Sequence, residues 1–150
     1  MVLHYPNYFN LQKVSIQATY SGAGGYTIFN ENAETKEGGL YTRDVLKKRL
    51  IVAMGGKAAE TVYFGRDFTS LGAIQDLKEA NQLAQKMIGN FGMGEKLEVF
   101  FNENINDDNM GFYNNKYSEY TKFNMDKETM KLVTEAYSDV YVVLFIFQFN

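Results

Sequence analysis

Apolar and polar residues alternate between residues 13 and 19, and this period of two is typical of a half-buried β-strand. The apolar positions of this segment are Val14, Ile16 and Ala18. A glycine-containing stretch at residues 20–25 ends the alternation, and a short extended segment resumes at residues 26–29. Because glycine permits tight turns, the two segments are predicted to form a β-hairpin. The polar stretch that follows, residues 30–39, is predicted to be a solvated loop.

Beyond this loop, apolar residues recur three and four positions apart, which is the period of an α-helix with one buried face. Thr42 is suited to cap the first helix, whose apolar face runs to Met54. Gly55 and Gly56 interrupt the pattern, and the same face then continues as far as Gly65. Two glycines inside a helix cost about 1 kcal/mol each relative to alanine, so we expect a kink or the close approach of another backbone there.

A second strong helix is predicted over residues 73–89. Its apolar stripe consists of Ala73, Leu77, Ala80, Leu83, Ala84, Met87 and Ile88. Asp76 interrupts this stripe. At about 100° per residue, Asp76 lies within about 40° of Ala80, Leu83 and Met87 around the helix axis. Its carboxylate should therefore lie at or inside the edge of the buried face.

An ionised carboxylate at the edge of a buried face needs compensation. The usual solutions are a hydrogen-bonded partner, a metal ion or protonation. A fourth solution is a place in the first turn of a helix, where free N–H groups and the helix dipole favour an acid. Asp76 is only a few residues into its predicted helix. The residues alone therefore favour capping or dipole stabilisation over metal ligation for Asp76.

In the last third of the chain the sequence predicts a short strand, a loop and a final helix. After a glycine-containing stop at residues 89–94, a short strand is predicted at residues 97–101 and a polar, asparagine-rich loop at residues 102–115. A final helix is predicted to begin near Asn124, with acidic residues in its first turn. There is no internal repeat and no clear linker, so residues 1–150 are predicted to form one domain that is mainly α with a small β-hairpin region.

Residues 140–149 are almost entirely apolar. This run is well short of the roughly 20 residues that a membrane-spanning helix needs. Its content of valine, phenylalanine and tyrosine is typical of a buried strand or an aggregation-prone tail. We expect a terminal element that packs on the core rather than a contact with a membrane.

Composition narrows the chemistry that the chain can support. With 45% hydrophobic and 22% charged residues, its 150 residues are typical of one soluble domain, and the absence of cysteine excludes disulfides, thiolate zinc clusters and a cysteine nucleophile. His4 is the one histidine, so a zinc site with two histidines cannot be completed within this sequence. The net charge of −3 argues against a nucleic-acid partner. Residues 1–10 lack the features of a secretory signal, and no targeting segment is predicted.

Six short strings are more informative than the periodicity. In chain order they are Lys13-Val14-Ser15-Ile16, Gly24-Gly25-Tyr26-Thr27, Gly55-Gly56-Lys57-Ala58-Ala59-Glu60, Phe64-Gly65, Gly72-Ala73-Ile74-Gln75-Asp76-Leu77 and Phe91-Gly92-Met93. Their order and spacing make a specific signal. Together they resemble the peptidase domain of the FtsH family, the membrane-anchored AAA+ zinc proteases of bacteria, mitochondria and plastids. The resemblance is strongest over residues 11–101 and weaker over residues 118–140.

This resemblance implies a mainly helical peptidase domain in a homo- or hetero-hexameric ring, beneath an ATPase ring that delivers polypeptide substrates. In the family, two histidines of an H-E-x-x-H helix and the aspartate of the Gly-Ala-x-x-Asp string hold zinc, and the motif's glutamate activates water. By resemblance Asp76 becomes the candidate third zinc ligand. The strand that can pair with a peptide corresponds to Val14, Ser15 and Ile16. The residues expected near the site are Gly55, Gly56, Glu60, Gly72 and Ala73.

The sequence also departs from the family pattern. By the family's usual spacing, the H-E-x-x-H helix falls just before Met1, and His4 lies after it, so we expect His4 to be a surface or partly packed residue. No G-x-x-x-x-G-K-[ST] motif of an ATPase module is present. Leu71 stands where the family usually has a hydroxyl residue, and Lys57 where it usually has arginine. An isolated chain of this sequence is therefore predicted to contain no catalytic residue and to have no peptidase activity.

The resemblance thus predicts one part of an FtsH-like, ATP-dependent zinc metalloendopeptidase that acts in proteolysis and membrane protein quality control. Zinc, ATP and attachment to a bacterial, mitochondrial or plastid membrane would all depend on segments outside this sequence. The alternative is a non-catalytic FtsH-like scaffold or assembly subunit that keeps the helical core and the ring contacts. Two explanations also remain for Glu60, which is either close to the site or a structural carboxylate that pairs within the helix bundle.

Overall fold

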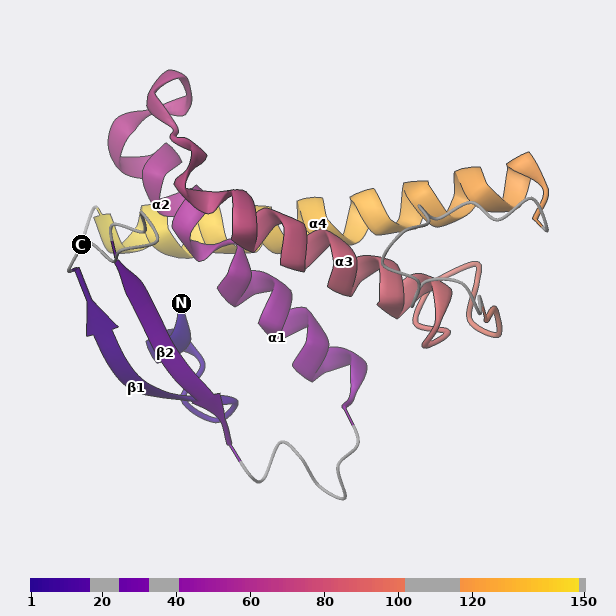
Figure 1. The fold of residues 1–150 in the computed structure, drawn as a ribbon, viewed down its shortest axis with the longest axis horizontal. Coiled ribbons are helices and arrows are strands. Elements are labelled where there is room, and N and C mark those ends of the chain that lie inside the picture. The colour runs from indigo at the N-terminus through magenta and orange to yellow at the C-terminus, as the bar shows by residue number, and fades with distance from the viewer. Residues whose placement is uncertain (17–24, 33–40, 102–116, 149–150) are drawn as a thin grey trace.

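One helix of 30 residues runs along the molecule, and three shorter helices pack against it (Figure 1). The computed structural model describes residues 1–16, 25–32, 41–101 and 117–148. The helices of this part of the chain are α1 (Arg43–Ala53), α2 (Gly55–Phe64), α3 (Ile74–Gly89) and α4 (Glu119–Gln148). Together with one small sheet they confirm the predicted class, mainly α with a small β region.

The sheet consists of strands β1 (Phe9–Ser15) and β2 (Tyr26–Glu31), which pair antiparallel. Phe9 lies opposite Glu31, and the register shifts by one residue within β1. The predicted hairpin is therefore confirmed. β1 begins four residues earlier than predicted, and its last residue is Ser15.

The half-buried face predicted for β1 is wrong. Val14 and Ile16 are 60% and 89% exposed, and the buried residue of β1 is Phe9. Its ring packs edge-to-face on Phe29, with 5.6 Å between the ring centres. No described helix packs broadly on either face of the sheet, so the alternating apolar side chains of β1 have no apolar surface to pack against. The remaining positions of the predicted strand, residues 17–19, lie outside the described residues.

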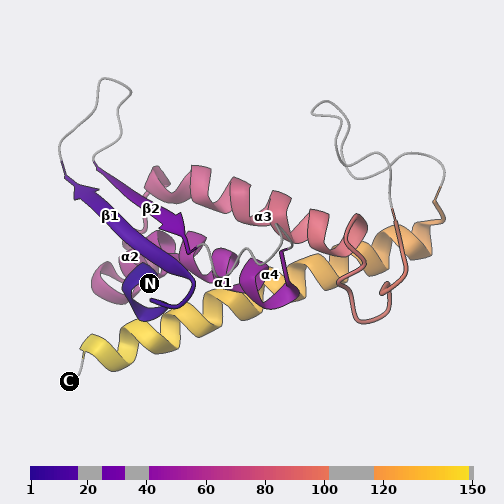
Figure 2. The same ribbon diagram turned by 90° about the horizontal axis from the view of Figure 1, so that it is seen from below.

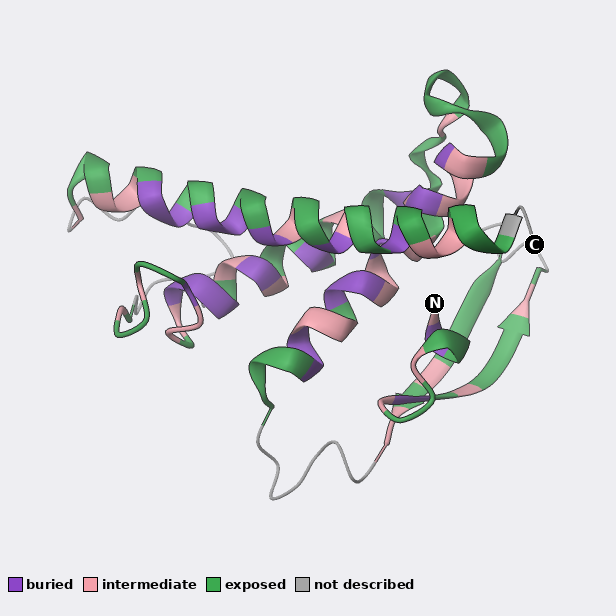
Figure 3. Ribbon diagram, turned by 180° about the vertical axis from the view of Figure 1, so that it is seen from behind, coloured by how far each residue is buried: buried purple, intermediate pink, exposed green. Residues whose placement is uncertain are grey.

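A single apolar core joins the inward faces of the four helices (Figure 3). Its fully buried large side chains include Leu50, Met54, Met87 and Val140. Thr42 begins α1 as predicted, because its Oγ1 accepts the N–H of Val45 at 3.3 Å. The helical period correctly predicted α1, α2 and α3 because each of these helices turns one apolar stripe toward the core.

The glycine pair marks the junction between α1 and α2. Met54 ends α1, donating its N–H to Leu50 O at 3.0 Å, and is also the N-cap of α2. The Met1 side chain packs against Gly55, where a Cβ would come within 3.2 Å of Met1 Cγ. The predicted interruption is thus present. At Gly55 the close approach is made by a side chain of the N-terminal segment and not by a second backbone.

Helix α4 begins earlier than predicted. It starts at Glu119 because Ser118 acts as its cap, with Oγ accepting the N–H of Thr121 at 3.2 Å. Asn124, the predicted cap, lies inside the helix, where its Nδ2 donates to Tyr120 O at 2.9 Å. The capping signal was therefore at the serine, six residues before the asparagine.

The tail at residues 140–149 is not a strand, because α4 continues to Gln148. A helix places every fourth residue on one face. Val140 is consequently fully buried and Leu144 packs partly on the same core, whereas Phe147 is 68% exposed. The expected packing of this terminal element on the core holds for that one face. In the described part of the chain, none of the helices is both long enough and apolar enough to span a membrane.

The strand predicted at residues 97–101 is also absent, and the segment forms turns. Glu128 of α4 holds the backbone just before it, accepting the N–H groups of Glu95 at 2.7 Å and Lys96 at 3.0 Å. Within the segment itself, Phe100 donates its N–H to Leu97 O at 3.1 Å, which closes a turn and not a strand ladder. The loop predicted at residues 102–115 lies outside the described residues.

Candidate metal centre

Asp76 lies in the first turn of α3 and faces α2. Its Oδ2 is 3.4 Å from the position that a Cβ on Gly56 would take, so the carboxylate lies directly beside α2. The residue as a whole is exposed, yet burial of its carboxylate against α2 raises the pKa of Asp76, and the charge of Glu79 raises it further. The carboxylate therefore lies at the edge of a helix interface, where the helical period predicted it.

Asp76 has no capping role in the structure. The N-cap of α3 is Ala73, and no side-chain hydrogen bond is made there. No described residue donates a hydrogen bond to the Asp76 carboxylate, although the residue lies in the first turn of α3, where the helix dipole favours an acid. Of the four solutions open from the sequence, a hydrogen-bonded partner is absent among the described residues, whereas the first-turn position, metal ligation and protonation are all compatible with these surroundings.

Glu60 bonds to the segment between α2 and α3. Its Oε2 accepts the N–H of Ser70 at 2.9 Å, and its Oε1 accepts the Ser70 hydroxyl at 2.6 Å. The Ser70 Oγ in turn accepts the N–H of Gly72 at 3.0 Å. The bonds from Ser70 are the main reason why the pKa of Glu60 is lowered. Glu60 thus pairs with the chain that leads to Asp76 and not with another helix of the bundle.

The N-terminus adjoins the same region (Figure 2). Met1 packs against Gly55, the residue before the glycine that faces Asp76. Val2 is buried, and burial lowers the pKa of the N-terminal amine. The first residues of the chain are therefore fixed beside the glycine pair of α2.

His4 is an exposed residue, as expected. Its ring packs edge-to-face on the rings of Tyr5 and Phe147, with 4.9 Å and 6.1 Å between the ring centres. Among the described residues, no group of three His, Cys, Asp or Glu side chains could hold a metal ion. An unpartnered carboxylate is a suitable oxygen ligand for zinc, but a zinc shell also needs nitrogen ligands from elsewhere. Asp76 therefore fits one ligand position of such a site and does not complete it.

The predicted peptide-binding strand is only partly a strand. Val14 and Ser15 belong to β1, and Ile16 follows its end. In the described chain, β1 pairs with β2 alone, so its second edge is not covered by another strand. An edge of this kind can accept an extended peptide through main-chain hydrogen bonds.

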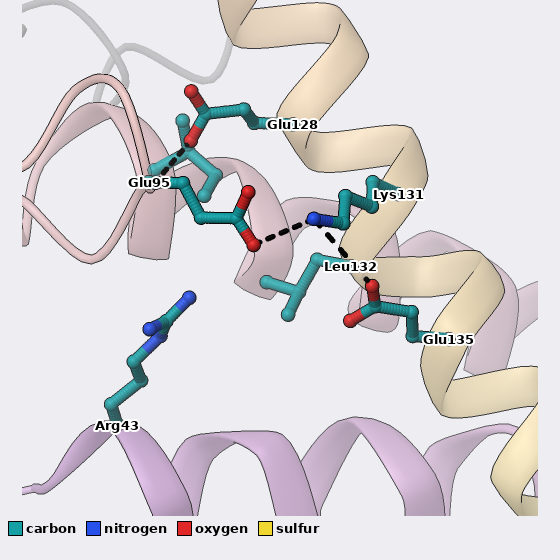
Figure 4. A pocket seen from close by; sticks show the side chains of 7 residues that line it. Arg43, Glu95, Glu128, Lys131, Leu132 and Glu135 are labelled. Atoms are coloured by element: carbon teal, nitrogen blue, oxygen red, sulfur yellow. Dashed lines mark hydrogen bonds and ion pairs between the residues drawn. The ribbon is translucent and has the colours of Figure 1, made fainter.

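A charged cluster between α1 and α4 was missed by the sequence analysis (Figure 4). Lys131 Nζ lies 2.6 Å from Glu95 Oε1 and 3.9 Å from Glu135 Oε1. The bond between Lys131 and Glu95 lowers the pKa of the glutamate and raises that of the lysine. The cavity between these residues is about 20 Å³, which is room for about one water molecule. Only the spacing of Lys131 and Glu135 was visible in the sequence.

A larger hollow of about 240 Å³ lies between the same two helices. Its floor includes Leu50 and Ala136, and its rim carries Lys47 and Lys48 on α1 and Asp139 on α4. None of the residues predicted for the zinc site lines it. It is therefore separate from the candidate metal centre, which lies where α2 meets the start of α3.

A helical domain with one candidate carboxylate ligand is consistent with a metallopeptidase domain. The pattern of peptidase family M41 matches residues 1–145. "ATP-dependent zinc metalloprotease FtsH 3" of a Synechocystis species is 33% identical over 149 residues, covering 93% of this chain and 23% of that protein. Two plant proteins named "ATP-dependent zinc metalloprotease FTSH 1, chloroplastic" are also similar. The protein of Oryza sativa is 32% identical and the match covers 89% of this chain. The protein of Arabidopsis thaliana is 33% identical and the match covers 88% of this chain.

The chain belongs to peptidase family M41, and the relatives it matches carry the name FtsH. The predicted resemblance is thus confirmed over nearly the whole chain. The chain spans only about a fifth of the length of these relatives, between 19% and 23%.

Proposed function

We propose that this chain contributes the Asp76 side of the zinc site in an FtsH-type, ATP-dependent metalloendopeptidase. The observation that carries the proposal is the Asp76 carboxylate, which lies beside Gly56 without a hydrogen-bond donor among the described residues. The two histidines and the general base would come from an H-E-x-x-H helix outside residues 1–150. Because Met1 lies against Gly55, such a helix directly before it would be close to the glycine pair.

The chain's own residues have distinct parts in this proposal. Asp76 presents an oxygen ligand at the junction of α2 and α3, beside Gly56. The edge of β1 that no other described strand covers, at Val14, holds an extended polypeptide through main-chain hydrogen bonds. Bound zinc would supply a Lewis acid that lowers the pKa of a water molecule.

The partners in this proposal follow from the family. Residues 1–150 form one peptidase-type domain of a homo- or hetero-hexamer with FtsH-like subunits, and the substrates are polypeptides. ATP acts through an ATPase module elsewhere in the assembly. Attachment to a bacterial, mitochondrial or plastid membrane is likewise proposed from the family. The scaffold alternative is not favoured, because the family match spans residues 1–145 and the relatives are named as proteases.

The direct test is zinc binding by the chain preceded by an H-E-x-x-H helix. Asp76→Asn is expected to weaken zinc affinity strongly, because the amide oxygen carries no charge and is a poorer zinc ligand than a carboxylate. Asp67→Asn is the matched control, since Asp67 is an exposed acid in the neighbouring 3-10 turn. Zinc stoichiometry and affinity that are unchanged in Asp76→Asn would show that Asp76 is not a ligand.

A further inference from the structure

We infer that Glu60 is a positioning residue for Asp76; this inference rests on the proposed role of Asp76 as a ligand. Glu60 stands four residues after Gly56 on α2, so the two residues share one face of that helix. Gly56 lies beside the Asp76 carboxylate, and Glu60 holds the segment that leads into α3. One face of α2 therefore both adjoins the carboxylate and holds the segment from which it projects.

Ser70 connects Glu60 to the turn that precedes α3. The Glu60 carboxylate accepts both the N–H and the hydroxyl of Ser70, and the same hydroxyl oxygen accepts the N–H of Gly72. A Cβ on Gly72 would lie 3.1 Å from Ser70 Oγ and 3.6 Å from Glu60 Oε1, so the turn is closely wrapped around these oxygens. The three hydrogen bonds fix the direction in which the backbone leaves Ser70.

The turn that follows, the 3-10 segment Leu71–Ala73, passes directly into α3. Ile74 donates its N–H to Leu71 O as the C-cap of the turn and is also the first residue of α3. Ala73 is buried and holds the inner side of the turn. Asp76 comes in the first turn of the helix, so a displacement of the 3-10 segment displaces its carboxylate as well.

These hydrogen bonds are poorly placed to stabilise the core, because Ser70 and Gly72 are exposed and Glu60 is only partly buried. Ion pairs and hydrogen bonds of exposed carboxylates add little to global stability. Residues that orient a metal ligand, in contrast, change metal affinity by about 10–100-fold when they are removed. The positioning role therefore predicts a large effect on metal binding and a small one on unfolding.

The experiment compares Glu60→Ala and Ser70→Ala with the parent chain, with Thr69→Ala as matched control. Thr69 carries a neighbouring hydroxyl that bonds to Arg66 O and not to Glu60. In the chain as it stands, amide chemical shifts of residues 72–76 and urea unfolding are measured. With an H-E-x-x-H helix added before Met1, Co²⁺ affinity and the cobalt absorption spectrum are measured.

Both alanine variants are expected to move the amide shifts of residues 72–76 and to weaken Co²⁺ binding by about 10–100-fold with a nearly unchanged urea midpoint. Ser70→Thr, which retains the hydroxyl, should restore binding, and Thr69→Ala should bind like the parent. Parent-like shifts or parent-like affinity in Glu60→Ala and Ser70→Ala, with Asp76→Asn impaired, would overturn the inference and leave the proposed function standing. Parent-like affinity in Asp76→Asn would overturn the proposed function.

Discussion

At the scale of single residues, two carboxylates at the same helix junction have opposite properties. Hydrogen bonds from Ser70 lower the pKa of Glu60, whereas burial and the charge of Glu79 raise the pKa of Asp76. The reason is the supply of donors, because Glu60 accepts two hydrogen bonds and Asp76 accepts none from the described residues. A carboxylate without donors costs folding free energy and remains available to a cation.

Asp76→Asn is accordingly expected to stabilise the isolated chain at neutral pH, although it removes the candidate ligand. The folded-state pKa of Asp76 lies above its ordinary value of 3.8, so the ionised form is less favourable in the folded chain than in the unfolded chain. The parent gains stability as pH falls through the raised pKa. The advantage of the variant should therefore be present at neutral pH and disappear in acid.

Urea unfolding of the two proteins from neutral to acidic pH measures this difference. Asp67→Asn again serves as control, because Asp67 is exposed and should give no comparable change. Equal stability of Asp76→Asn and the parent at neutral pH would mean that the Asp76 carboxylate pays no desolvation cost. A gain in stability combined with a loss of metal binding is the usual behaviour of a functional residue.

At the scale of elements, α4 shows why a local pattern can mislead. The valines and aromatic residues near its C-terminal end favour a strand when they are taken alone. The segment nevertheless continues a helix that has already begun at Glu119, and each added residue gains a hydrogen bond without a new nucleus. Burial of Val140 and partial packing of Leu144 outweigh propensity differences of less than about 1 kcal/mol per residue.

Val140→Ala is expected to destabilise the chain by about 2 kcal/mol, because it removes two buried methyl groups and leaves a cavity. Val142→Ala, the matched control on the same helix, should stay within about 0.5 kcal/mol of the parent because Val142 is 56% exposed. Chemical denaturation measures both values. Equal losses would contradict the helix, since residues two apart share a face only in a strand.

At the scale of the whole molecule, the four helices enclose one core, and the candidate ligand lies at its margin where α2 meets the start of α3. The N-terminus is fixed beside the same margin through Met1 and the buried Val2. The family's zinc chemistry needs nitrogen ligands in addition to one carboxylate. Among the described residues, no group of His, Cys, Asp or Glu side chains supplies these further ligands.

The isolated chain is consequently expected to bind no stoichiometric zinc and to cleave no casein. Elemental analysis of the purified protein and a casein assay with and without chelator measure both properties. Native mass determined on the same sample tests whether the chain forms the proposed hexamer. Chelator-sensitive casein cleavage by this chain would contradict the prediction.

The sequence by itself determined the features that depend on neighbours along the chain. The cap of α1, the apolar stripes of α1 and α3, the interruption at Gly55 and the order of the family strings were all readable, because helical interactions join residues three or four apart. Asp76 was also correctly placed at the edge of a buried face, since that position follows from the helical period.

Only the tertiary structure decided what lies opposite each face. The contact of Asp76 with Gly56, the bond from Ser70 to Glu60 and the exposure of the predicted inner face of β1 all depend on how the elements dock. The same is true of the tail, whose helical form is stabilised by packing on the core. Side chains ten or twenty residues apart meet only after docking, so no local period of the sequence encodes their contact.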